Sequence, residues 1–110
     1  MLALNLAGFL LADTKQRLRD AEVYLRKARA LSPGDPAILD SWGWLLYQRG
    51  DAAAATKVLE HAARFAPLEP EILVHLAAAS GKKEPLDRAA ALHPSPELQR
   101  RIEELRKVVR

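Results

Sequence analysis

The side chains best suited to catalysis or metal binding are few and scattered in this chain of 110 residues. Its three histidines, His61, His75 and His93, are too far apart in sequence to sit on one helical turn as paired metal ligands. There is no cysteine, which excludes disulfides, zinc–thiolate sites and cysteine nucleophiles. The sequence therefore predicts no catalytic residue, no metal site and no enzyme activity.

Phosphate and nucleic-acid binding are also disfavoured. The five glycines fall in neither a GxGxxG nor a GxxxxGK frame, so no nucleotide or other cofactor is predicted. The 17 basic residues exceed the 14 acidic ones by three, but the two signs are interleaved. Pairs four residues apart, such as Glu22 with Arg26, are typical of a solvated helix face. Because the charges form no patch of one sign, we expect no nucleic-acid partner.

The elements that carry these side chains are predicted to be helices. Ala, Leu, Glu, Lys and Arg make up 64 of the 110 residues, and these are strong intrinsic helix formers. The length suits one domain and is too small to enclose a deep active site. The composition therefore predicts a single all-α domain.

An internal repeat with a period of 34 residues organises the chain. Small, large and proline residues recur at this spacing in two sets: Ala21, Leu25, Ala28 and Pro33 match Ala55, Leu59, Ala62 and Pro67, while Leu39, Trp42 and Gly43 match Leu73, Leu76 and Ala77. Gly8 precedes Gly43 by 35 residues, which indicates one inserted residue in an early loop. A period of this length predicts a stack of similar helical units.

The central unit has clear helix boundaries. Pro36 suits a first helical turn, Gly50 suits a left-handed C-terminal position, and Asp51 suits the N-cap of a following helix. These signals predict two helices, residues 36–49 and 52–65.

These positions resemble the tetratricopeptide repeat (TPR) in its bacterial form, a helix-turn-helix unit of 34 residues. The resemblance implies an all-α, right-handed superhelix (a solenoid) of about three such units, the third shortened, plus a C-terminal capping helix. It places Trp42 in the packing stripe between helices, as core, and Gly43 where two helices approach closely. The expected boundaries are repeat one, 1–35; repeat two, 36–69; repeat three, 70–94; and the capping helix, 95–110.

The third unit is predicted to be shorter than the second. Its first helix should span residues 70–80, and its paired helices should each have lost about one turn, because Pro67 and Pro94 are only 27 residues apart. Ser95, as an N-cap before a proline, starts the capping helix, which places an apolar side against the stack and charged sides outward.

The first helices of stacked TPR units line a concave groove that, by resemblance, holds a protein or peptide ligand. Large aromatic anchors with a few orienting polar groups are the chemistry of such a groove. The expected lining residues are Asn5, Phe9, Asp40, Ser41, Trp44, Tyr47, Gln48 and His75. In an array this short there is an alternative, in which Trp44 and Tyr47 pack against the neighbouring first helix.

The resemblance also excludes one kind of ligand. Family members that grip the acidic tails of chaperones use a clamp of basic and amide residues, whereas here Phe9 and Glu71 occupy two of the corresponding places. Because Glu71 repels a carboxylate, a ligand with apolar side chains and a basic residue opposite Asp13, Asp40 or Glu71 fits better.

The alternative function is structural: an assembly or oligomerisation element, for example as the C-terminal part of a longer array. The leucine-rich N-terminal helix is where self-association is expected. No apolar stretch approaches the roughly 20 residues of a membrane span, and the N-terminus lacks the basic region of a signal peptide. We therefore expect a soluble protein without membrane insertion, with a cytoplasmic location favoured.

Overall fold

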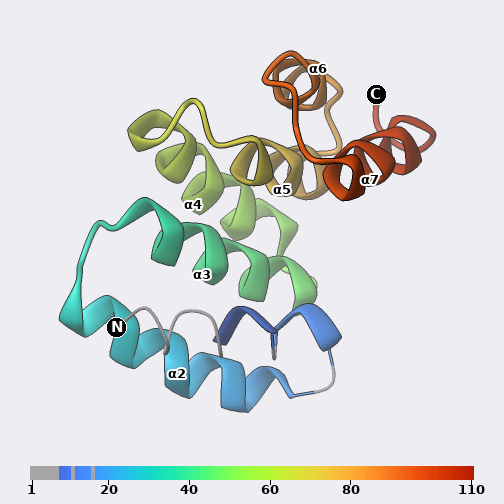
Figure 1. Ribbon diagram of the computed structural model, residues 1–110. Coiled ribbons are helices and arrows are strands. Elements are labelled where there is room, and N and C mark those ends of the chain that lie inside the picture. The colour runs from blue at the N-terminus through green and yellow to red at the C-terminus, as the bar shows by residue number, and fades with distance from the viewer. Residues whose placement is uncertain (1–7, 11, 16) are drawn as a thin grey trace.

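The computed structural model describes residues 8–10, 12–15 and 17–110 of the chain. Within these residues every regular element is a helix, and successive helices joined by short turns pack side by side (Figure 1). The all-α prediction is confirmed for this part of the chain. Asn5 and most of the N-terminal helix expected to self-associate lie outside the described residues.

The helices lie close to their predicted positions. Residues 8–10 and 12–14 are helical, and they are followed by α2 (Leu18–Leu31), α3 (Pro36–Gln48), α4 (Ala52–Phe65), α5 (Pro70–Ser80), α6 (Glu84–Ala90) and α7 (Pro96–Arg106). The predicted helices 36–49, 52–65 and 70–80 correspond to α3, α4 and α5.

Capping residues set the ends of these helices. The carboxylate of Asp35 accepts a hydrogen bond from the Ala37 amide at 2.9 Å, and Asp51 caps the start of α4 in the same way. Gly50 has a φ of 90° and Gly81 a φ of 71°, a backbone conformation that glycine adopts without strain. The chain turns between helices where these residues predict it.

The shortening of the third unit is unequal, which corrects the expectation of one lost turn in each helix. Helix α5 has 11 residues against 13 in α3, but α6 has only 7 against 14 in α4. The backbone just before α6 is hydrogen-bonded to the end of the chain, since Lys83 donates its N–H to the Arg110 carbonyl at 2.8 Å. Arg110 in turn donates to the Gly81 carbonyl at 2.9 Å, which ties the end of the chain to the α5–α6 turn.

Close helix approach explains the glycines inside the repeats. A Cβ atom added to Gly43 would lie 2.6 Å from Cγ of Leu59 on α4. One added to Gly8 would lie 2.5 Å from Cγ of Leu25 on α2. Leu25 and Leu59 are themselves one period apart, so the same glycine–leucine contact closes the first and second units. The prediction that two helices approach closely at Gly43 is confirmed.

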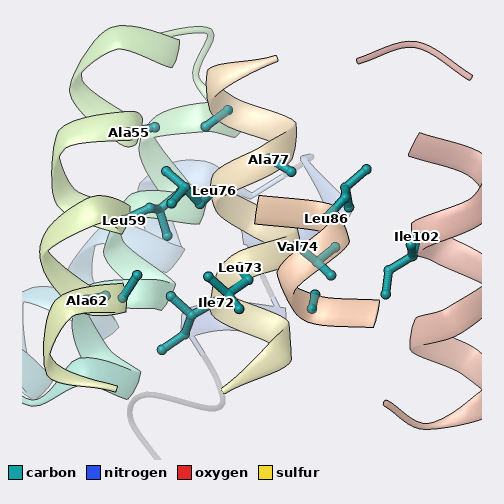
Figure 2. Close-up of a cluster of buried hydrophobic side chains, with 13 residues drawn as sticks. Ala55, Leu59, Ala62, Ile72, Leu73, Val74, Leu76, Ala77, Leu86 and Ile102 are labelled. Carbon is teal, nitrogen blue, oxygen red and sulfur yellow. The ribbon is translucent and has the colours of Figure 1, made fainter. Parts of the chain in front are cut away.

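Two apolar clusters form the core. The larger one runs from α4 through α5 to α6 and α7, with side chains from all four helices pointing toward one another (Figure 2). Its labelled members are Ala55, Leu59, Ala62, Ile72, Leu73, Val74, Leu76, Ala77, Leu86 and Ile102. The smaller cluster joins residue Ala12, α2 and α3. Because Ile102 of α7 is fully buried, α7 covers the end of the stack as a capping helix would.

The burial of the two tryptophans differs from the expectation that Trp42 is core and Trp44 lines the groove. Trp44 is buried, with 4 % of its surface exposed, whereas Trp42, predicted to be core, is only partly buried. The guanidinium groups of Arg26 and Arg29 on α2 lie over the Trp42 ring, at 5.7 and 4.8 Å from its centre. Trp42 therefore packs against the smaller core cluster at a partly exposed seam between α3 and α2. Trp44 points to the other side of α3, toward Asp13, His75 of α5 and Arg101 of α7.

A charged contact next to this seam joins α2 to the end of α3. The carboxylate of Glu22 accepts from Arg49 and from Arg26, the latter at 3.1 Å. The Arg49 guanidinium, and after it that of Arg26, holds the pKa of Glu22 below its ordinary value.

Candidate functional site

The predicted groove residues converge around the indole of Trp44. Its Nε1–H donates to Oδ1 of Asp13 at 3.0 Å. The Tyr47 ring stacks on it with centroids 5.0 Å apart, and the imidazole of His75 lies 4.5 Å away. The guanidinium of Arg101 on α7 lies over the same indole, 5.1 Å from the ring centre. The aromatic group thus joins α3, α5, α7 and the helical residues near Asp13.

Helix periodicity explains how α3 and α5 present these side chains. Trp44 and Tyr47 are three residues apart on α3 and share one face. Asp40 lies one turn earlier on the same face and meets His75 of the next unit, with Oδ1 and Nδ1 2.7 Å apart. Because a carboxylate only accepts, the imidazole Nδ1–H is the donor in this buried hydrogen bond. The contact locks α3 to α5.

Phe9 and Gln48 complete the cluster near the N-terminal helical residues. The ring of Phe9 lies 5.6 Å from that of His75. The amide Nε2 of Gln48 donates to the backbone carbonyl of Asp13 at 3.2 Å. Asp13 therefore receives hydrogen bonds from two α3 side chains, and its carboxylate also lies 4.0 Å from the Arg101 guanidinium.

Burial divides the predicted residues into two groups. Trp44, Ser41 and His75 are each less than 5 % exposed, and Asp40 is 8 % exposed. The Ser41 hydroxyl donates within its own helix, to the Ala37 carbonyl at 3.2 Å. As the side chains lie here, these four offer almost no surface to a ligand. The packing of Trp44 and Tyr47 against neighbouring helices matches the alternative left open by the sequence.

Phe9, Tyr47 and Gln48 remain partly exposed. A hollow of about 610 Å³ lies beside the cluster, and its lining is charged: Asp13, Glu97, Arg100, Arg101 and Glu104. Two of these residues, Asp13 and Arg101, contact Trp44. Four of these five residues belong to α7, which the sequence predicted only as a cap. The local sequence around Arg101 gives no signal of a groove, because the spacing of the charged residues on α7 is typical of an ordinary solvent-facing helix side.

The histidines do not converge. His61 stacks on Phe65 of α4, with ring centroids 5.0 Å apart, and His93 follows α6 with a φ of 54°. Among the described residues, no group of three His, Asp or Glu side chains is placed to hold a metal ion. In the same residues, no helix is both long and apolar enough to cross a membrane.

Comparison with known proteins bears on the family. No protein-family model matches the chain, and no solved structure matches it. A curated relative, TPR repeat-containing protein PA4667 of Pseudomonas aeruginosa, is 43% identical over 75 residues. The aligned segment covers 68% of this chain but only 12% of the relative's own length. TPR proteins are in general non-catalytic and mediate protein–protein interactions. The repeated helix-turn-helix units and this relative together identify the chain as a tetratricopeptide-repeat protein.

Proposed function

We propose that this chain is a non-catalytic protein-binding module whose groove, between the helical residues near Asp13, α3 and α7, takes an extended peptide or a partner helix. The observation that carries the proposal is the hollow of about 610 Å³ lined by Asp13 and four residues of α7, next to the aromatic cluster that Asp13 and Arg101 contact at Trp44. In this proposal the chain is a single domain, with repeat units at residues 1–35, 36–69 and 70–94 and a capping helix at residues 95–110.

The chemistry of the groove suggests what the ligand presents. Tyr47 and Phe9 are partly exposed and offer aromatic surface, and the amide of Gln48 donates to the backbone carbonyl of Asp13, a residue of the charged rim. The rim has three acidic residues, Asp13, Glu97 and Glu104, against two arginines. A segment with apolar side chains and a basic residue is therefore the best complement.

Peptide selection tests this proposal. Peptides selected from a displayed random library on the purified chain would be synthesised and titrated into a Trp42→Phe background, where Trp44 is the remaining fluorescent indole. Tyr47→Ala and Gln48→Ala should each weaken binding about tenfold, as loss of a central contact does. The matched control is Val23→Ala, at an exposed apolar position on α2. Equal affinity in all of these variants would refute the groove assignment.

The alternative proposal is a structural role, as an assembly element that stacks on further repeats or on a second copy. The aligned segment is only 12% of the length of the TPR repeat-containing relative. Repeat units in longer arrays stack on their neighbours, which supports this alternative. Sedimentation over a concentration series distinguishes the two roles. A mass that rises with concentration supports assembly, and a constant monomer mass argues against self-stacking.

A further inference from the structure

A second hollow lies on another part of the surface, between α4 and α6. Its volume is about 760 Å³, within the range of roughly 300–1,000 Å³ that is usual for ligand sites. Helix α5 packs against both α4 and α6 (Figure 1). Leu76 and Ala79 of α5 are part of the lining of the hollow. None of its lining residues borders the groove around Trp44. We call this hollow the α4–α6 groove.

Comparison with the preceding unit explains why the α4–α6 groove is open. Its floor residue Leu76 lies one period after Trp42, whose indole is covered by two arginines of α2. The positions on α4 that match those arginines, Arg26 and Arg29, hold Glu60 and Ala63. Both line the groove. The α4–α6 groove therefore has Leu76 in place of the indole. It has Glu60 and Ala63 in place of the two guanidinium groups.

The short α6 adds to this loss of side-chain volume. With only 7 residues, half the length of α4, it covers less of the seam than a full second helix would. The floor that results is apolar and made of Leu76, Ala63, Ala79 and Pro85. Each of the first three is 7 % exposed, so the floor itself is tightly packed. The hollow lies above this floor.

The rim of the α4–α6 groove is basic. Four cationic side chains line it, against two acidic ones: Lys57, Arg64, Lys82 and Arg88 against Glu60 and Glu84. Glu84 pairs with Arg88 at 3.5 Å. Within the described part of the chain, Lys57, Arg64 and Lys82 have no acidic partner, and all three are exposed. With the carboxylate of Glu60 counted among them, the lining side chains still carry two more positive charges than negative ones.

We propose that the α4–α6 groove binds an acidic peptide segment of a partner protein, which lays one large aromatic side chain over the apolar floor that Leu76, Ala63, Ala79 and Pro85 form together. The aromatic side chain takes the place that Trp42 fills in the preceding unit. Flanking Asp or Glu residues pair with Lys57 and Arg64 on one wall and Lys82 on the other. This ligand is opposite in charge to the one proposed for the groove around Trp44, so the chain has two distinct binding faces.

Peptide probes test the occupant directly. The probe is the blocked heptapeptide DEDWEDE, titrated into the ¹⁵N-labelled chain and followed by amide chemical shifts. The controls are DEDAEDE, which lacks the aromatic side chain, and KRKWKRK, which reverses the charge. Saturable shifts in α4, α6 and the Gly81 turn, with DEDWEDE alone, support the proposal. Shifts with KRKWKRK of equal size, or with DEDAEDE, overturn it.

The same spectra separate this inference from the proposed function. The indole Nε1–H of Trp44 and the side-chain amide of Gln48 report on the other groove, and neither should move with DEDWEDE. If those two signals move and the α4 and α6 amides do not, the acidic probe binds around Trp44 and the α4–α6 proposal is wrong. Loss of binding around Trp44 in the library experiment leaves this test unaffected.

Variants complete the test. The double substitution Lys57→Glu with Arg64→Glu changes only exposed side chains and should weaken DEDWEDE binding more than about tenfold. Its matched control, Arg19→Glu with Lys27→Glu on exposed positions of α2, makes the same charge change and should leave binding within about twofold. Leu76→Trp should fill the floor from within and abolish binding. Equal affinity in the two charge-reversed doubles overturns the proposal even if Leu76→Trp fails to fold.

Discussion

The exchange of roles between the two tryptophans leads to a quantitative prediction. The packing stripe of the repeat predicts Trp42 as the residue that stabilises the fold, whereas the structure buries Trp44. We expect Trp44→Ala to lower the free energy of unfolding more than Trp42→Ala does. The ranking follows from what each indole contacts.

The magnitudes follow from burial and contacts. Trp44 is 4 % exposed and donates a hydrogen bond to Asp13, so its truncation opens a cavity and removes this hydrogen bond. Truncation of a buried tryptophan to alanine costs about 3–5 kcal/mol. Trp42 is partly buried under Arg26 and Arg29, and each exposed cation–π contact contributes about 0.5–1 kcal/mol. Its truncation should therefore cost about 1–2 kcal/mol.

Urea unfolding followed by far-UV circular dichroism measures both losses, because the helical signal does not depend on either indole. Total stability of a small domain is about 5–15 kcal/mol, so Trp44→Ala is best measured with an osmolyte such as sucrose present in all samples. Trp44→Phe, which keeps an aromatic ring but loses the Asp13 hydrogen bond, should fall between parent and Trp44→Ala. A loss for Trp42→Ala equal to or above that for Trp44→Ala, at unchanged m-value, would refute the reasoning.

Three further predictions concern the helix contacts. Gly43→Ala should destabilise the chain, since overpacking against the facing leucine costs about 1–3 kcal/mol and the gain in helix propensity is at most about 1 kcal/mol; a raised Tm contradicts this. Asp40→Ala should cost about 1–3 kcal/mol in urea unfolding by leaving the buried His75 Nδ1–H without an acceptor, and Asp40→Asn, which keeps one, should cost less. Because Arg49 lowers the pKa of Glu22, that carboxylate stabilises the fold above its ordinary pKa, and the contribution is lost as the pH falls through the lowered value. Glu22→Gln should therefore have a lower Tm than the parent at neutral pH, a difference that disappears in acid; a difference that persists there argues against the charged contact.

Helix positions and ends could be predicted because their causes are local. The N-caps Asp35 and Asp51 satisfy amides two or three residues away, and Gly50 relieves strain at its own backbone. The close approach at Gly43 was also predictable, because the period repeats the contact once per unit. None of these features depends on where distant parts of the chain lie.

The site was predicted only in part. The resemblance to the TPR family placed Phe9, Asp40, Trp44, Tyr47 and His75 on one surface, and these residues meet in the structure. It did not predict that four of the eight lining residues would be enclosed. Both the covering Arg101 and most of the charged rim come from α7, more than fifty residues after Trp44 in the chain.

The sequence by itself determined the all-helical repeat, its turns and the residues at which helices cross, since each rests on backbone conformation or on contacts within one period. Only the tertiary structure decided which tryptophan is buried. Trp42 and Trp44 lie on nearly opposite faces of one helix turn, so their burial depends on which face meets α7 and Asp13 and which meets the arginines of α2. The α4–α6 groove has the same origin, because an unfilled space exists only after α5 has brought α4 and the shortened α6 together.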